Sequence, residues 1–202
     1  MGKRVFVSAD WNEPFDTRSW DKEVVDKIRK WVTDDRYDLE IDCTDDVHDS
    51  VLDNSGDCRR CDIKGECGRH INRSSVVIFV IGDKTGTKTA GVCDGVSCSP
   101  AYSGQIKRNC IYNTSPAEDI YEGGVTDGNK MSYLKHEITK SAQKGKSIIL
   151  VFNSMRKEES WIPSWYNTLL VDGNFTELCR VPFWKNIERT KDCYQDIKEY
   201  LQ

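Results

Sequence analysis

The stretch Ser75-Val76-Val77-Ile78-Phe79-Val80-Ile81-Gly82 decides the fold class of this chain. Its apolar run is unbroken, whereas a strand with one face in water alternates apolar and polar residues. Both faces of such a strand need cover, which in a chain that alternates strands and helices is typical of a central strand in a parallel sheet. A second run of the same kind, Ser147 to Phe152, predicts another such strand. The sequence therefore predicts an α/β fold with a parallel sheet.

The remaining elements follow from shorter patterns around these two runs. Apolar residues at helical spacing predict helices, and period-two alternation predicts a strand near the edge of the sheet. The predicted strands are Val5–Val7, Tyr37–Asp42 and about Cys179–Phe183; the predicted helices are Trp20–Val32, Tyr133–Lys144, where Gly145 provides the stop, and about Glu188–Leu201. Residues 83–130 show neither period and predict a long loop. We expect one domain over residues 1–202, with five strands.

Composition and charge exclude several classes of function. The 29 basic and 33 acidic residues leave a net charge of −4, and the chain has no basic run of the kind that follows a nucleic acid backbone. No apolar stretch approaches the roughly 20 residues that cross a membrane. The chain passes from Met1 straight into a strand pattern, without the apolar segment of a signal peptide. We therefore expect a cytoplasmic protein without nucleic-acid or membrane partners.

Four segments together resemble one family of α/β domains. They are Lys3-Arg4-Val5-Phe6-Val7-Ser8, the central strand closed by Gly82-Asp83-Lys84-Thr85, the segment Tyr133-Leu134-Lys135-His136-Glu137-Ile138, and Gly145-Lys146-Ser147-Ile148-Ile149. Over residues 3–153 the chain resembles the TIR-like domain family, in particular the NAD-processing TIR-like component of bacterial Thoeris antiphage defence. The resemblance implies a three-layer flavodoxin-like fold with strand order 2-1-3-4-5. In this chain a long Cys-containing loop is expected after the third strand.

The resemblance also implies an activity. Catalytic members of the family cleave the nicotinamide–ribose bond of NAD and make a linear or cyclic ADP-ribose-derived signal for a downstream effector protein. They use a glutamate in an aromatic-x-x-x-Glu motif, which here falls on Tyr133 and Glu137, although the family aromatic is usually Trp. The predicted function is that of an NAD glycohydrolase or ADP-ribosyl cyclase. The alternative is a non-catalytic interaction module that acts by self-association, which a Tyr at position 133 would fit.

The residues of this motif are suited to that chemistry. Positions 133 and 137 lie one turn apart on a helix, so both side chains point the same way. A carboxylate aimed at the ribose can stabilise the cationic sugar that develops as the glycosidic bond breaks. Glu137 is therefore the candidate catalytic residue. The alternative interpretation of Glu137 is a solvent-exposed glutamate in an ordinary amphipathic helix.

Further candidate substrate-binding residues follow the first strand. Ser8, Asp10 and Trp11 lie at the carboxyl edge of the predicted sheet, where such folds bind ligands, and Tyr133 joins them as the aromatic of the motif. The alternative role of the first three is helix capping and packing. No Gly-rich phosphate fingerprint follows this strand, so NAD is expected as a substrate and no cofactor is predicted.

Histidines and cysteines add no assigned site. His48, His70 and His136 are scattered, and nothing favours a catalytic role over a surface position. Six of the nine cysteines fall in or beside the loops expected after the second and third strands, where they could converge on a structural zinc ion. Their spacings match no standard zinc pattern closely, so free thiols are favoured and no metal ligand is assigned. The six are Cys58, Cys61, Cys67, Cys93, Cys98 and Cys110; Cys43, Cys179 and Cys193 are expected in the core.

Overall fold

The computed structural model describes residues 3–9, 20–33, 60–83, 85, 131–172, 175–183 and 190–201. Within these ranges four strands form one parallel sheet in the order β1-β2-β3-β4. The strands are β1 (Val5–Ser8), β2 (Val76–Ile81), β3 (Ser147–Phe152) and β4 (Thr176–Pro182). The predicted α/β class with a parallel sheet is confirmed.

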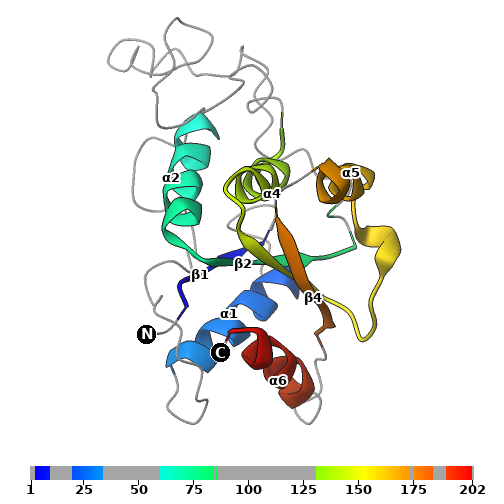
Figure 1. Cartoon of the computed structure of the whole chain (residues 1–202). Coiled ribbons are helices and arrows are strands. Elements are labelled where there is room, and N and C mark those ends of the chain that lie inside the picture. The colour runs from blue at the N-terminus through cyan, green and yellow to red at the C-terminus, as the bar shows by residue number, and fades with distance from the viewer. Residues whose placement is uncertain are drawn as a thin grey trace, which may run out of the picture.

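Helices cover both faces of this sheet (Figure 1). The helices α1 (Trp20–Thr33) and α6 (Thr190–Leu201) lie on one face; α2 (Arg60–Arg73), α4 (Tyr133–Gln143) and α5 (Ser164–Asp172) lie on the other. A short 3₁₀ helix, Glu159–Trp161, precedes α5. The described residues therefore form three layers, with the sheet between two layers of helices.

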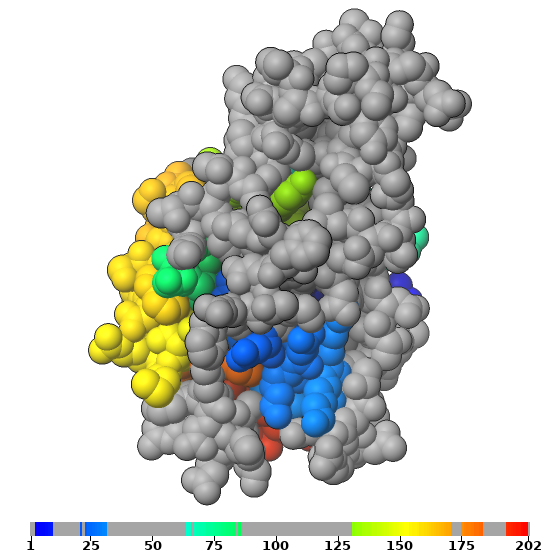
Figure 2. All heavy atoms as spheres, turned by 180° about the vertical axis from the view of Figure 1, so that it is seen from behind, coloured from blue at the N-terminus to red at the C-terminus, as the bar shows by residue number. Residues whose placement is uncertain are grey.

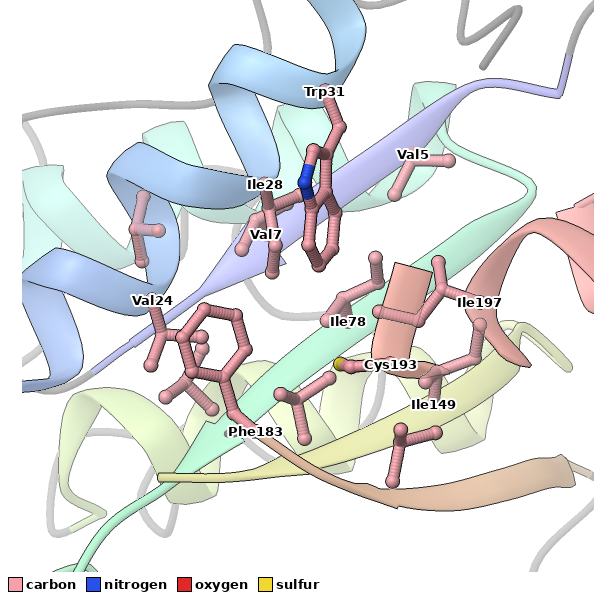
Figure 3. Close-up of a cluster of buried hydrophobic side chains, with 14 of the residues drawn as sticks. Val5, Val7, Val24, Ile28, Trp31, Ile78, Ile149, Phe183, Cys193 and Ile197 are labelled. Carbon is pink, nitrogen blue, oxygen red and sulfur yellow. The ribbon is translucent and has the colours of Figure 1, made fainter. Parts of the chain in front are cut away.

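Each face of the sheet has its own hydrophobic core, because successive side chains of a strand point to opposite faces. Ile78 of β2 lies in the core under α1 and α6, while Val77 and Phe79 lie in the core under α2, α4 and α5. In the first core the ring centroid of Trp31 is 6.1 Å from that of Phe183, and Ile197 of α6 lies in the same cluster (Figure 3). All six residues of β2 are buried, which explains the unbroken apolar run.

Both ends of α4 are fixed by local hydrogen bonds. At its start the Ser132 side chain accepts a hydrogen bond from the Lys135 amide, which is an ordinary N-cap. At its end Gly145 adopts a φ of 62°. The amides of Gly145 and Lys146 donate to carbonyl oxygens of the last turn, in the pattern of a glycine-terminated helix. The stop predicted at Gly145 is confirmed, and it fixes the position of the helix that carries the candidate site.

Two helices were not predicted from the sequence, namely α2 and α5. The segment before β2 forms a helix of 14 residues. The strand expected at residues 37–42 lies outside the described residues. Of the loop expected at residues 83–130, the structure describes Asp83 and Thr85. No helix in the described part of the chain is long and apolar enough to cross a membrane.

Candidate functional site

The candidate catalytic residue Glu137 meets the end of the first strand. The helix α4 leads directly into β3, so it runs against the strand direction and its first turns lie at the carboxyl edge of the sheet. Ser8 is the last residue of β1 at the same edge. Its Oγ donates a hydrogen bond to Oε2 of Glu137 across 129 positions of sequence. The fold thus brings together two residues that the sequence predicted separately.

This contact is shielded from water. Ser8 is 4 % exposed and Glu137 is 7 % exposed, while Leu134 and Ile138 on either side of Glu137 are core residues. The Glu137 backbone carbonyl accepts a 2.8 Å hydrogen bond from the hydroxyl of Ser141, one turn further along α4. The interpretation of Glu137 as a solvent-exposed glutamate is therefore wrong. A carboxylate that is buried and hydrogen-bonded has a fixed position, as an electrostatic role requires.

Tyr133, one turn before Glu137, lies under a buried cation. Its side chain is half-buried and packs against the core beneath α4. The Nζ atom of Lys64, from α2, lies 5.9 Å from the centroid of the Tyr133 ring. The same Nζ donates a 2.6 Å hydrogen bond to the carbonyl oxygen of Met131, just before the start of α4. The aromatic residue of the motif, at the start of α4, is thereby in contact with α2.

His136 is buried, contrary to the surface position that its isolation in the sequence favoured. It is 6 % exposed and lies on the turn of α4 that also carries Glu137. Burial, reinforced by the positive charges of Lys64 and Lys140, lowers the pKa of His136 from 6.5 to about 4. The imidazole is therefore neutral at pH 7, and a role as a cationic acid near neutral pH is not expected.

A second polar group lies at the carboxyl edge, on the side of α1. The carboxylate of Asp21 accepts a 2.7 Å hydrogen bond from Nδ2 of Asn153, which follows β3. It packs so closely on Gly82 that a Cβ atom there would lie 2.7 Å from Oδ1 of Asp21. The Gly82 amide donates to the hydroxyl of Thr85. Figure 2 shows the face on which α1 (blue), the residues that follow β2 (green) and the segment after β3 (yellow) reach the surface. Asp21 therefore ties α1 to the ends of the central strands.

Several predicted residues cannot be placed at the site. Asp10 and Trp11 lie outside the described residues, as do Cys43, Cys58, Cys93, Cys98 and Cys110. Cys67 and Cys193 are buried free thiols, and Cys179 is a half-buried one, so the expected core position holds for Cys193. Among the described residues there is no group of three side chains able to hold a metal ion.

Sequence reasoning missed three buried charged residues, Asp21 of α1, Lys64 of α2 and Lys140 of α4. All three are buried, although each belongs to a residue type that is usually exposed. Lys64 could have been found only by predicting α2 and the face that it presents to α4. Comparisons of the chain with models of protein families, with curated proteins and with solved structures gave no match.

Proposed function

We propose that the protein is a TIR-like NAD glycohydrolase or ADP-ribosyl cyclase. The observation that carries the proposal is the buried Glu137 carboxylate, held by Ser8 at the carboxyl edge of a parallel sheet, with Tyr133 one helical turn before it. Ligands of open α/β sheets bind at this edge. The proposal includes the flavodoxin-like strand order 2-1-3-4-5, with residues 37–42 as the remaining strand beside β1.

The proposed reaction breaks one bond of NAD. The bond between C1′ of the ribose and N1 of nicotinamide cleaves, and its electron pair neutralises the positively charged ring of the leaving nicotinamide. The positive charge that develops on the ribose is stabilised by the carboxylate of Glu137. Water then attacks C1′ and releases a proton, giving ADP-ribose; alternatively, a nucleophilic atom of the same molecule attacks C1′ and closes a ring.

Ser8 and Tyr133 have separate roles in this scheme. The hydroxyl of Ser8 fixes the rotamer of Glu137, which removes side-chain freedom before substrate binds. A carboxylate offers several lone-pair positions, so ribose hydroxyls can donate to Glu137 while Ser8 still holds it. Tyr133 supplies an aromatic surface near the entry to α4. Asp10 and Trp11 complete the proposed set of substrate-binding residues.

The proposed biological role is antiphage signalling in the cytoplasm. The ADP-ribose-derived product would act as a small-molecule signal for a downstream effector, as the family resemblance implies. Uncontrolled consumption of NAD would harm the cell, so low activity is expected until infection activates the protein. Self-association fits this scheme as the means of activation.

The test is NAD turnover in extracts of phage-challenged cells that express the wild type, Glu137→Gln or the control Glu23→Gln. Glu23 is an exposed glutamate of α1, on the opposite face of the sheet from α4, so the control removes the same charge outside the proposed site. Nicotinamide release with an ADP-ribose-type product is expected for the wild type and the control, with at least a hundredfold loss (about 3 kcal/mol) in Glu137→Gln. Equal turnover by all three proteins would refute Glu137 as the catalytic residue. Folded wild type that consumes no NAD under challenge by several phages would instead support the self-associating module.

A further inference from the structure

The described part of α2 contributes a buried lysine to the candidate site. Lys64 is 1 % exposed, although lysine is almost never fully buried unless its charge has partners. Its ammonium group donates to the carbonyl oxygen of Met131 and lies over the ring of Tyr133. Both contacts are made to the start of α4 and not to the solvent. The ammonium group of Lys64 therefore contacts the segment that carries the Tyr133–Glu137 motif.

These contacts fix the position at which α4 begins. Met131 precedes the N-cap residue Ser132, and Tyr133 is the first residue of the helix. A displacement of this turn moves the ring directly and moves Glu137 through the rigid helix. Lys64 therefore contacts the helical turn that precedes Glu137, and the Glu137 carboxylate in turn accepts a hydrogen bond from Ser8 of β1.

A second buried lysine strengthens the seam between the two helices. Lys140, three residues after Glu137, is buried, and a Cβ atom added to Gly68 would lie 3.9 Å from its Cε. Its aliphatic stem therefore crosses α2 at Gly68, one turn after Lys64. The charges of both lysines reach His136 on the intervening turn.

We propose that Lys64 is a positioning residue of the Tyr133–Glu137 site: its ammonium group locks the first turn of α4 to α2 and so sets where the aromatic ring and the carboxylate lie. This inference deepens the proposed function and rests on it for its catalytic consequence. Lys64 does not need to touch NAD. It acts through the start of α4.

The experiment compares Lys64→Met with Lys135→Met in the full chain. Methionine keeps most of the apolar stem of lysine and removes its charge, so the packing of the side chain is largely retained while the Met131 carbonyl oxygen loses its donor. Lys135 is the matched control: it lies in the same first turn of α4, but its Nζ lies 5.6 Å from the ring centroid of Trp165 of α5 and its cap hydrogen bond uses the backbone amide, which methionine retains. Lys64→Arg, which retains the charge, is measured beside them and keeps the test decisive if Lys64→Met does not fold.

Two measurements do not depend on catalysis. In Lys64→Met the pKa of His136, followed by NMR of its ring protons, is expected to rise above about 4 but to stay below 6.5, because burial, the largest cause of the lowering, remains while one of the two charges that add to it is gone. Amide exchange of His136, whose N–H donates to the Ser132 carbonyl in the first turn, is expected to accelerate at least about tenfold. Lys135→Met should leave the pKa near the wild-type value and the exchange rate unchanged. Unchanged values of both quantities in Lys64→Met would overturn the positioning role, whether or not the protein consumes NAD.

The third measurement is NAD turnover. Lys64→Met is expected to lower kcat at least about tenfold with a smaller change in KM, because a misplaced carboxylate acts mainly on the transition state. Lys64→Arg should retain more activity than Lys64→Met, and Lys135→Met should match the wild type. An active wild type with unchanged kcat in Lys64→Met would overturn the inference. A wild type without turnover would instead overturn the proposed function, and the pKa and exchange measurements would still decide whether Lys64 fixes the turn.

Discussion

The hydrogen bond between Ser8 and Glu137 joins β1 to α4, and the variant Ser8→Ala removes it with little change of volume. Both side chains are buried, so water cannot fully replace the lost donor. A hydrogen bond to a charged group contributes about 1.5–3 kcal/mol, and we expect Ser8→Ala to lower the free energy of unfolding by that amount. In a domain of this size each 1 kcal/mol corresponds to about 2–4 °C, so the midpoint of thermal unfolding should fall by several degrees.

The matched control for this prediction is Ser141→Ala. Ser141 is a fully buried serine of α4 that donates to the backbone carbonyl of Glu137, so the same hydroxyl is removed beside the same residue. That carbonyl belongs to a helix, and hydroxyl bonds of this kind add little to helix stability, so the expected loss is below about 1 kcal/mol. The difference between the two variants therefore isolates the bond to the carboxylate.

The assay is urea unfolding at pH 7, with the slope of the transition compared between variants. The double variant Ser8→Ala with Glu137→Gln closes a thermodynamic cycle: the glutamine can accept only a neutral hydrogen bond, so Ser8→Ala should cost about 1 kcal/mol less in that background. Equal losses for Ser8→Ala and Ser141→Ala, together with strict additivity in the cycle, would refute the assignment of this bond as a stabilising contact to a charged group.

Two further predictions concern stability and pH. Gly82→Ala should destabilise the protein by about 1–3 kcal/mol, because the added Cβ would lie 2.7 Å from Oδ1 of Asp21. Gly68→Ala should stabilise it by about 0.5–1 kcal/mol, because alanine favours a helix and its Cβ would lie at an ordinary contact distance of 3.9 Å from Cε of Lys140. Chemical unfolding of both variants measures these opposite changes in the free energy of unfolding. The pKa of His136 is about 4 in the folded protein, below its ordinary value of 6.5. The unfolded chain therefore binds the proton first as the pH falls. The free energy of unfolding should decrease between pH 6.5 and pH 4, by up to about 3 kcal/mol. Unfolding measured over this range should show a smaller decline in His136→Gln, and an equal decline would contradict a neutral buried imidazole.

Much of the fold could be predicted because its central strands carry strong local signals. The run of β2 is apolar throughout and that of β3 is apolar from Ile148 onward, and the structure buries these residues in the interior of a parallel sheet. The helix α4 had a clear amphipathic pattern and a glycine stop, and its predicted start at Tyr133 is confirmed. Such elements are fixed by residues close together in sequence, so a single sequence is enough to find them.

The helix α2 was missed because its sequence has neither a high helix propensity nor a clear amphipathic pattern, although the folded protein packs it against the core. It contains two glycines and several charged residues within 14 positions, which weakens both helix propensity and amphipathic pattern. Its stability comes from contact with α4 and with the core under both helices, where Cys67 and Ile71 are buried. Tertiary packing of this kind is not visible in local periodicity.

The candidate site was predicted in part, for a similar reason. Glu137 and Ser8 could each be selected from the sequence, Glu137 by its motif and Ser8 by its place after the first strand. The hydrogen bond between them depends on the order of the strands and on the direction of α4, which only the assembled sheet defines. Lys64 could not be selected at all, because a lysine in a polar segment is normally solvated.

The combination of buried charges around α4 favours a functional explanation over a stabilising one. Glu137, Lys64 and Lys140 are each at most 7 % exposed, and all three lie in or beside one helix–helix seam. Taking charged groups out of water is costly, and apolar residues of similar volume often stabilise a protein as well or better. A chain under selection for stability alone would gain nothing by placing a carboxylate and two ammonium groups here. The carboxylate lies at the carboxyl edge of the sheet, where open α/β folds bind ligands, and this position supports the proposed role of Glu137.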